Sequence, residues 1–321
     1  MTYVNKLNVL LTSAAAKVPL LTALRCAAKR INNSAVIIAG DSSSPVVSQY
    51  FADEFWLMPP LSEATSDDIF RALLKRKVSH ILPSRDGELL FWAKYKGHLA
   101  SEGVQVLVAD EQSILRCLDK QLFADFLLKK GLPAIATYSN LDTVTHSSSN
   151  WVVKERFGAG SQNIGLALKP EAALQHATKL KQAVFQPFVT GRELSIDAWL
   201  NKAGQLKAHI YRYRIKVQHG ESQITQTVAL SQYDDIIRDT LQALQLTGSV
   251  VMQAIIDEQQ QLHIIECNSR FGGASTLGIK AGVDSLYWSL AESCGVDVNT
   301  IPFVPVTTPI TQIRCAGDQY L

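Results

Sequence analysis

The chain has 321 residues, of which 47% are apolar and 19% charged, and its net charge is +2. This composition is typical of a folded globular protein with a sizeable core and excludes a disordered tail; the near-neutral charge gives no support to a nucleic-acid or anionic-membrane partner. The five cysteines are odd in number and include no CxxC pair, which argues against a disulfide framework or zinc site and favours a reducing cytoplasm. Cys267 lies beside Glu266, but a small buried strand residue explains it better than a catalytic thiol does.

The first residues weakly resemble a signal peptide, because Lys6 precedes a short apolar run. Lys17 interrupts this run, so a strand over 7–12 followed by a helix over 17–30 explains the segment better. No stretch approaches the roughly 20 apolar residues of a transmembrane helix. We therefore expect no membrane partner.

Strands and helices alternate through the first 110 residues. Apolar runs predict strands at 35–39, 55–58, 81–83 and 104–108, and helical spacing predicts helices at 69–76 and 88–99. Such alternation predicts a parallel sheet, on which ligands bind at the carboxyl ends of the strands. The segments at these ends are 12–17, 40–44 and 83–88. In the last of them, Asp86 and Glu88 are candidates to contact a substrate amine, with a helix-capping role for Asp86 as the alternative.

The pattern changes near residue 110. One long helix is expected over 111–130, ended by Gly131 and Pro133. The chain then becomes rich in strands, predicted at 134–138, 151–155, 164–168, 183–188, 193–200, 206–214, 224–230, 249–258 and 261–267. Helices are expected at 170–182, 233–246 and 283–294, and turn signals at 201–204 and 257–260 predict hairpins. The second part is therefore mostly antiparallel.

The most specific polar pattern closes the last predicted strand. Side chains alternate along a strand, so Glu266 and Asn268 share one face, and Gln253 on the preceding strand is a candidate for the same site. One carboxylate and amide oxygens suit Mg²⁺, which binds together with phosphates. Arg270 follows and suits bidentate phosphate contact. The alternative is a surface ion pair between Glu266 and Arg270.

A second pattern is an apolar strand that carries Lys154 and runs into a glycine-rich turn with Gly158, Gly160 and Ser161. A lysine between apolar neighbours is costly unless it meets an anion. Glycines let backbone N–H groups approach phosphate oxygens. The alternative is a plain hairpin turn with a lysine that reaches solvent.

A third pattern is a short segment around a proline, made of Gln186, Pro187, Phe188 and Val189. Proline lacks an N–H, so backbone groups around Pro187 are free to meet a flat polar ring. Glu193 follows as a candidate acceptor for ribose hydroxyls, and Asp197 shares its strand face. The alternative is an interdomain linker that leads into an amphipathic strand.

The segment 211–221 is basic and aromatic, but the low net charge argues against a nucleic-acid stripe. Arg212 and Arg214 share a strand face. They are candidates to hold a substrate carboxylate or an acyl phosphate, and an exposed strand face is the alternative.

These patterns, in this order, resemble the ATP-grasp superfamily over nearly the whole chain, in particular its carbamoyl-phosphate-synthase-large-subunit-like and biotin-carboxylase-like members. The resemblance implies an amino-terminal parallel α/β pre-ATP-grasp domain followed by an ATP-grasp module of two α+β subdomains. The corresponding ranges are 1–110, 111–187 and 188–321.

The resemblance also implies a role for each candidate residue. The phosphate contacts it implies are Lys120, Lys154, Gly158, Gly160, Ser161 and Arg270. The adenine and ribose contacts it implies are Gln186, Pro187, Phe188, Val189 and Glu193, with Asp197 included as a further nucleotide contact. The Mg²⁺ ligands it implies, which also suit Mn²⁺, are Gln253, Glu266 and Asn268. Two departures are the absence of glycines in the 12–17 turn and a length too short for a complete carbamoyl-phosphate synthase large subunit.

The implied function is an ATP- and Mg²⁺-dependent ligase in the cytoplasm. It would convert a carboxylate to an acyl phosphate for attack by an amine, both amino-acid-like, and release ADP and phosphate. A homodimer or a partner subunit is expected. One alternative is the nucleotide-binding subunit of a split carbamoyl-phosphate-synthase-like complex with no independent activity. Another is a metabolite-binding protein that uses only the first domain.

Overall fold

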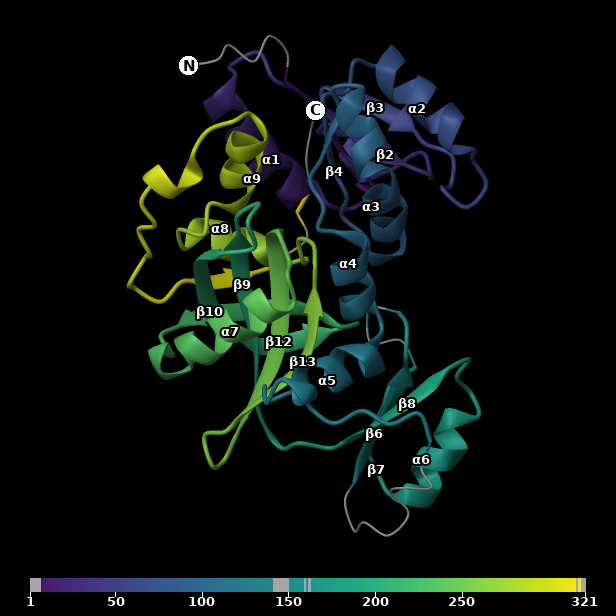
Figure 1. Ribbon diagram of the computed structural model, residues 1–321, viewed down its shortest axis with the longest axis vertical. Coiled ribbons are helices and arrows are strands. Elements are labelled where there is room, and N and C mark those ends of the chain that lie inside the picture. Colours follow the sequence, from purple (N-terminus) through teal and green to yellow (C-terminus); the bar gives the residue numbers. More distant parts are fainter. Residues whose placement is uncertain (1–6, 141–149, 159, 161–162, 316, 319–321) are drawn as a thin grey trace.

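A computed structural model describes residues 7–140, 150–158, 160, 163–315 and 317–318. In this part of the chain the strands form three sheets (Figure 1). A parallel sheet lies at the top of the view, a six-stranded sheet in the middle and a three-stranded sheet at the bottom. This arrangement confirms the expected parallel α/β domain followed by mostly antiparallel α+β parts.

The parallel sheet has the order β3-β2-β1-β4-β5. Its strands are β1 (Asn8–Leu11), β2 (Val36–Asp41), β3 (Glu54–Leu57), β4 (His80–Leu82) and β5 (Gln105–Val106). Its helices are α1 (Val18–Ile31), α2 (Ser66–Lys75) and α3 (Asp86–Ser101), with a 3-10 turn η1 (Val47–Tyr50). The chain adds β2 on one side of β1 and β4 on the other. The order therefore reverses at β1 and β4, where the carboxyl ends of parallel strands leave a crevice for ligands.

The expected single helix over 111–130 is wrong in one respect, because the structure divides it. α4 (Glu111–Leu118) and α5 (Lys120–Lys129) meet at Asp119, whose φ of −90° and ψ of 103° are extended. The Asp119 carboxylate accepts the backbone N–H groups of Gln121 and Leu122, each at 3.1 Å. The side chain thus begins a new helix and fixes the direction of Lys120.

The three-stranded sheet has the order β7-β6-β8, with antiparallel neighbours. Its elements are β6 (Trp151–Glu155), β7 (Gly165–Leu168), α6 (Pro170–Ala177) and β8 (Ala183–Pro187). It has a small core of its own, formed by Trp151, Val153, Ala173 and Phe185. The expected strand over 134–138 forms only isolated bridges, from Ala134 to Ile264 and from Tyr138 to Phe185. It changes partner between two sheets, so no continuous ladder develops.

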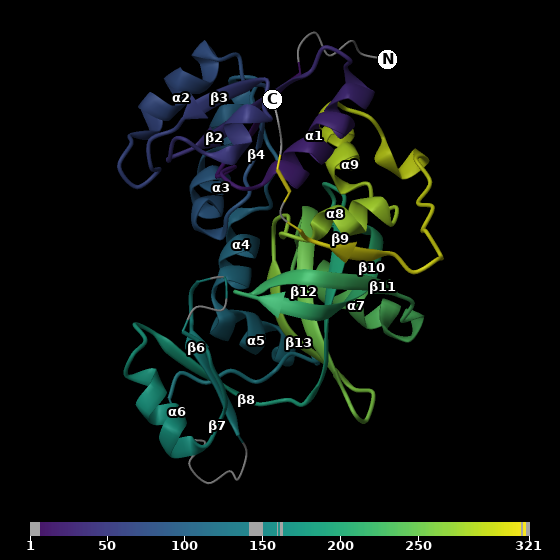
Figure 2. The same cartoon turned by 180° about the vertical axis from the view of Figure 1, so that it is seen from behind.

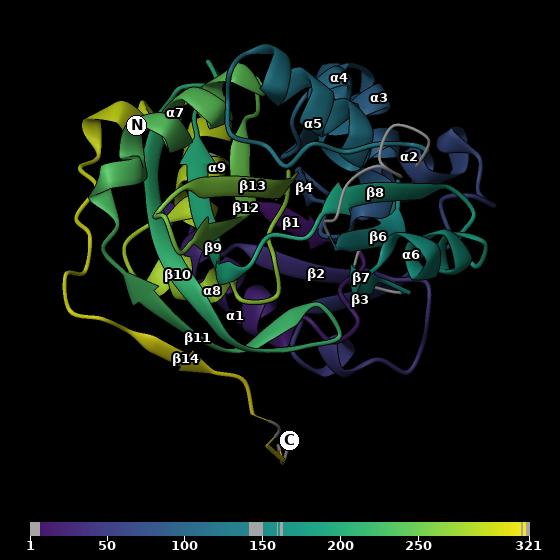
Figure 3. The ribbon, with the colours of Figure 1, turned by 90° about the horizontal axis from the view of Figure 1, so that it is seen from below.

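The six-stranded sheet has the order β13-β12-β9-β10-β11-β14, which Figure 3 follows from one edge to the other. Its strands are β9 (Gly191–Leu200), β10 (Leu206–Gln218), β11 (Glu221–Val228), β12 (Gly248–Asp257), β13 (Leu262–Asn268) and β14 (Thr311–Ile313). Its helices are α7 (Asp234–Ala243), α8 (Ser275–Lys280) and α9 (Ser285–Ser293), with 3-10 turns η2 (Ser231–Tyr233) and η3 (Val298–Thr300). The sequence pattern predicted neither α8 nor β14.

One apolar core runs from the parallel sheet to the six-stranded sheet. Leu10, Phe123, Ile196 and Met252 belong to it, so β1, α5, β9 and β12 share a continuous interior. A second core joins α1 to α9, which lie next to each other in both Figures 1 and 2, and it includes Phe271. These cores fix the carboxyl edge of the parallel sheet beside the end of β13. No helix of the described residues is long and apolar enough to cross a membrane.

Candidate functional site

One face of the six-stranded sheet is polar, and the strand register explains why. Gln253 on β12 lies opposite Ser195 on β9 and opposite Glu266 on β13, while Arg212 on β10 lies opposite Ser195. Residues paired in register share a face. The intervening apolar side chains, such as Met252, turn to the opposite face and enter the core. The predicted residues that the register gathers on this face are Glu193, Asp197, Arg212, Arg214, Gln253, Glu266 and Asn268.

Arg214 lies at the centre of this face. Its Nη1 donates to Glu193 and, over 2.9 Å, to Oε1 of Gln253. Its Nη2 donates to the Gly220 carbonyl at 2.7 Å and its Nε to Oγ of Ser222 at 3.2 Å. One buried guanidinium therefore holds a predicted ribose ligand and a predicted metal ligand together.

Arg212 and Asp197 form an enclosed ion pair. Nε of Arg212 donates to Oδ2 of Asp197 at 2.6 Å, and both side chains are less than a tenth exposed. Oγ of Ser275 donates to the other carboxylate oxygen at 3.2 Å. A Cβ added at Gly278 would lie 2.8 Å from the Asp197 Cβ, so α8 covers the pair closely. The pair therefore lies under α8, next to Arg214 on the same sheet face.

Two lysines approach Glu266 from other elements. Lys154 stands on β6 and Lys120 opens α5, and both are buried. Burial lowers the pKa of Lys154 to about 8, with Lys120 lowering it further and Glu266 opposing the shift. Burial also lowers the pKa of Lys120, again opposed by Glu266. Glu266 is the acidic group whose charge raises the pKa of both lysines.

Lys154 has no hydrogen-bond or ion-pair partner among the residues that the structure describes, although it is only 8% exposed. Lys120 differs, because its Nζ donates to the Gly158 carbonyl at 2.9 Å. An unpaired buried ammonium costs several kcal/mol of folding free energy, by order of magnitude, unless an anion meets it. Lys154 is therefore the side chain that most clearly calls for an anionic ligand.

The glycine-rich turn after β6 lies over Lys120. Gly158 has a φ of +126° and Gly160 a φ of +78°, values in the left-handed region that favours glycine. Ser161 lies outside the described residues. Arg156 anchors the start of the turn, with Nε and Nη2 donating to the two Asp119 oxygens at 2.8 and 2.6 Å. The turn is thus tied to the break between α4 and α5.

The proline segment leads from the three-stranded sheet to β9. Gln186 is buried, and its Nε2 donates to Oγ1 of Thr137 at 2.8 Å. Pro187 ends β8, the Phe188 N–H donates to the Asn150 carbonyl, and Val189 follows between the two sheets. The Gln186 side chain therefore supports the fold, and the backbone of 187–190 connects the three-stranded sheet to the six-stranded sheet.

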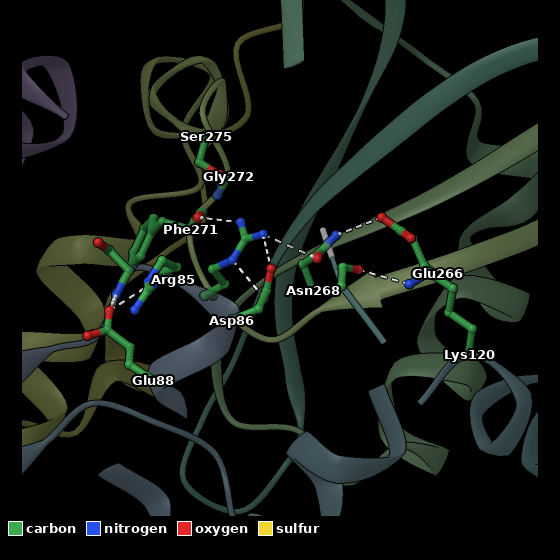
Figure 4. A network of polar contacts seen from close by, with 12 residues as sticks. Arg85, Asp86, Glu88, Lys120, Glu266, Asn268, Phe271, Gly272 and Ser275 are labelled. Carbon is green, nitrogen blue, oxygen red and sulfur yellow. Dashed lines mark hydrogen bonds and ion pairs between the residues drawn. The ribbon is translucent and has the colours of Figure 1, made fainter. Parts of the chain in front are cut away.

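Arg270 joins the end of β13 to the parallel domain (Figure 4). Its Nε and Nη2 donate to the two oxygens of Asp86 at 2.8 and 2.5 Å. Nη2 also reaches Oδ1 of Asn268 at 3.4 Å, and Nδ2 of Asn268 donates to Glu266 at 3.2 Å. The proposed surface pair of Glu266 with Arg270 is not formed.

The capping role considered for Asp86 is also absent. Arg85 is the N-cap residue of α3, and Oε1 of Glu88 accepts the backbone N–H groups of Ser84 and Arg85 at 2.8 and 3.0 Å. Glu88 is buried and serves the local backbone. Asp86 is thereby free to reach across to Arg270.

A small cavity opens beside this network. The residues that line it are Asp86, Cys117, Leu118, Lys120, Gly158, Glu266, Cys267, Asn268 and Ser269. Oγ of Ser269 is buried and has no hydrogen-bond partner among the described residues, so Ser269 is a candidate ligand contact that the sequence patterns did not predict. In the sequence, only the position of Ser269 between Asn268 and Arg270 indicates such a contact. Contact with Cys117 and burial raise the pKa of Cys267 well above its usual range, as befits a structural thiol.

The polar face also offers oxygen ligands for a hard cation. Among the described residues, no three His, Cys, Asp or Glu side chains gather as a metal site. Gln253, Glu266 and Asn268 instead supply two amide oxygens and one carboxylate on one face. This donor set fits Mg²⁺ when phosphate oxygens and water complete the shell.

Comparisons with known proteins match both halves of the chain. Residues 117–274 match the model of the ATP-grasp domain, and residues 9–107 match that of the PylC-like N-terminal domain. The chain matched none of the curated protein sequences compared with it.

Solved structures are similar in fold at low identity. A biotin carboxylase–β-γ-ATP complex from Campylobacter jejuni has a TM-score of 0.72 and 12% identity, over 89% of this chain and 70% of that chain. N5-carboxyaminoimidazole synthetase from Staphylococcus aureus, complexed with ADP, has a TM-score of 0.74 and 15% identity, over 95% and 81%. L-amino acid ligase from Bacillus licheniformis has a TM-score of 0.68 and 16% identity, over 89% and 74%.

Proposed function

Because this chain belongs to the ATP-grasp superfamily, with a PylC-like N-terminal domain, we propose that it is an ATP-dependent ligase that joins a carboxylate to an amine. The observation that carries the proposal is Lys154, a buried lysine without a partner among the described residues, whose pKa the charge of Glu266 on the polar sheet raises against the effect of burial. A nucleotide phosphate between the two sheets would supply the missing anion. We also propose domain limits after residues 110 and 187.

The nucleotide would lie between β6 and the polar face. Lys120 and Lys154 would hold its phosphates, with backbone N–H groups of Gly158 and Gly160 above them. The backbone at 187–189 would meet the adenine edge, and Glu193 the ribose. Ser161 keeps its proposed phosphate role from the family resemblance alone.

Mg²⁺ fits the oxygens of Gln253, Glu266 and Asn268, and Mn²⁺ suits the same ligands. A bound metal ion would supply positive charge against the phosphate oxygens. Gln253 and Asn268 each now accept a hydrogen bond from an arginine, Arg214 and Arg270 respectively. These arginines would orient the amide oxygens and later balance developing negative charge.

The proposed reaction has two steps. A substrate carboxylate oxygen attacks the γ-phosphorus, the bond to the β-phosphate oxygen breaks, and ADP leaves. The amine nitrogen then attacks the acyl carbon, phosphate leaves, and the amine gives up a proton. The protein contributes position and charge neutralisation, so no side chain need become a covalent nucleophile.

The two organic substrates would bind where the polar face ends. Arg270 marks this point, beside the carboxyl ends of β1 and β4. The end of the six-stranded sheet and the ligand crevice of the parallel sheet therefore meet at one place. We propose amino-acid-like substrates for it, with Arg212 and Arg214 behind the acyl phosphate.

The test is ADP formation across a panel of amino-acid pairs, comparing wild type with Glu266→Gln. Loss of the carboxylate should lower turnover by about 100-fold or more, because a charged ligand disappears from the phosphate site. Glu258→Gln, in the exposed turn after β12, is the matched control and should keep full activity. Full turnover of Glu266→Gln would contradict the assignment of Glu266 as a metal ligand. Nucleotide binding without ADP formation, but with activity on adding a partner chain, would favour the split-complex subunit instead.

A further inference from the structure

We propose that Asp86 is a positioning residue, which holds Arg270 so that one edge of its guanidinium remains available for the nucleotide's terminal phosphate. The inference rests on the proposed nucleotide site. It adds a residue of the parallel domain to a phosphate site otherwise built from the ATP-grasp module. Asp86 would act through Arg270, without touching the nucleotide.

The contact spans 184 positions of sequence and joins two domains. Asp86 is the first residue of α3, the helix that follows β4, and Arg270 follows the end of β13. The two side chains are 13% and 17% exposed, so solvent screens their attraction only weakly. Phe271, the next residue, packs into the core of α1 and α9 and keeps this end of the chain in place.

The arrangement of the donors decides which edge of Arg270 is free. A guanidinium has five N–H donors in a fixed plane. Asp86 takes Nε and one N–H of Nη2, Asn268 takes the other N–H of Nη2, and the Phe271 carbonyl takes one of Nη1. One N–H of Nη1 has no partner among the described residues.

The weakest of these bonds is the one to Asn268, at 3.4 Å. If Asn268 turns its oxygen to a metal ion, Nη1 and Nη2 each present one N–H on the same edge of the guanidinium. Two parallel donors of this kind match two phosphate oxygens. Asp86 need not move, because it occupies the other edge.

The surrounding charges show why a carboxylate is needed at position 86. Burial, and then repulsion by Arg270, lower the pKa of Lys17 to about 8, while Glu88 and Asp86 oppose the shift. Nζ of Lys17 donates to the carbonyl and hydroxyl of Ser84 at 2.5 and 2.8 Å. Without the Asp86 charge, Arg270 would stand near another cation with no bidentate partner, and its side chain would lose its fixed direction.

The test needs no knowledge of the organic substrates. The affinities of wild type and Asp86→Asn for Mg-ADP and for Mg-AMP-PNP, a non-hydrolysable ATP analogue, are measured by calorimetry. We expect Asp86→Asn to bind Mg-AMP-PNP about tenfold more weakly and Mg-ADP within about twofold of wild type, because only the terminal phosphate reaches Arg270. Asp110→Asn removes a comparable but exposed ion pair, with Lys96 of α3, and should change neither affinity.

A double-mutant cycle separates positioning from general destabilisation. Arg270→Lys keeps a charge but loses the two-donor edge, and it should weaken Mg-AMP-PNP as Asp86→Asn does. The double variant should lose little more than either single variant, because both act through one group. Asp86→Glu should recover part of the loss, and Arg270→Lys alone still tests the proposal if Asp86→Asn does not fold.

Three outcomes would overturn the proposal. Equal losses for Mg-ADP and Mg-AMP-PNP would assign Asp86 a structural role only. Additive losses in the double variant would show that Asp86 does not act through Arg270. Unchanged affinity of Asp86→Asn for both nucleotides would remove the proposal and leave the nucleotide site intact, whereas wild type that binds neither nucleotide would remove both.

Discussion

Lys154 shows how a single side chain can point to a ligand. Its side chain is buried on β6, and the described residues give it no partner, while the neighbouring Lys120 has the Gly158 carbonyl. Burial of an ammonium favours the neutral amine, which is why its pKa falls to about 8. A bound phosphate would reverse that preference and restore the charge.

This pKa gives a prediction for nucleotide binding. Phosphate binds the protonated lysine, so affinity for Mg-ADP is full below pH 8 and falls as the pH rises above it. At pH 9 the affinity should be about tenfold weaker than at pH 7, by linkage to one proton. Calorimetric titration between pH 7 and 9.5 measures this.

Two variants separate Lys154 from Lys17, whose pKa also lies at about 8. Lys154→Arg stays charged throughout this range, so its affinity should remain level to pH 9.5. Lys154→Met should bind weakly at every pH. A fall of affinity in Lys154→Arg equal to that in wild type would show that another group titrates.

The break between α4 and α5 shows how one element places the site. Asp119 caps α5, pairs with Arg156 before the glycine turn, and so directs both Lys120 and the turn. The sequence pattern predicted an unbroken helix because its apolar spacing continues past 119. The family resemblance implies a phosphate contact at Lys120, but it does not mark Asp119 as a helix boundary.

Asp119→Ala should lower the free energy of unfolding by about 2 kcal/mol, since it removes a cap and a partly buried ion pair. Thr65→Ala is the matched control, because Thr65 caps α2 through one backbone N–H and donates to the Asp68 carboxylate, with no arginine partner. That variant should lose about 1 kcal/mol. Urea unfolding compares the two. Equal losses would mean that the Arg156 pair contributes nothing to stability.

The arrangement of the three sheets sets how the molecule can respond to a ligand. The parallel and six-stranded sheets share one core, whereas the three-stranded sheet has a small core of its own (Figure 1). A unit with few buried apolar contacts opens more readily than the rest of the protein. The three-stranded sheet is therefore the part that we expect to close on a nucleotide.

Hydrogen exchange tests this expectation. Mg-ADP should slow amide exchange in β6, β8 and 187–190 by about tenfold or more, because the nucleotide bridges the two antiparallel sheets. Exchange in β1 and β2 should be unchanged. Lys154→Met, at the same nucleotide concentration, should show no such protection. Equal protection of β1 and β2 would instead indicate a general stabilisation.

Local patterns in the chain were enough to predict the fold class and to place several candidate site residues on one strand face. Alternation along a strand put Glu266 and Asn268 on one face, and the apolar run around Lys154 marked a cation in need of an anion. Alternating strands and helices predicted the parallel sheet, and the structure confirms it. These features depend on the spacing of residues that lie close together in the sequence.

Contacts between residues far apart in the sequence could not be predicted from such local patterns. The hydrogen bonds of Arg214 to Glu193 and Gln253 form because β10, β9 and β12 are neighbours in one register. The pair of Asp86 with Arg270 depends on how two domains pack. No local preference encodes either one, because a side chain's partner across a sheet or an interface is set by strand order, register and the shared core. The sequence pattern thus predicts candidate groups for the chemistry, and only the tertiary structure decides which of them meet.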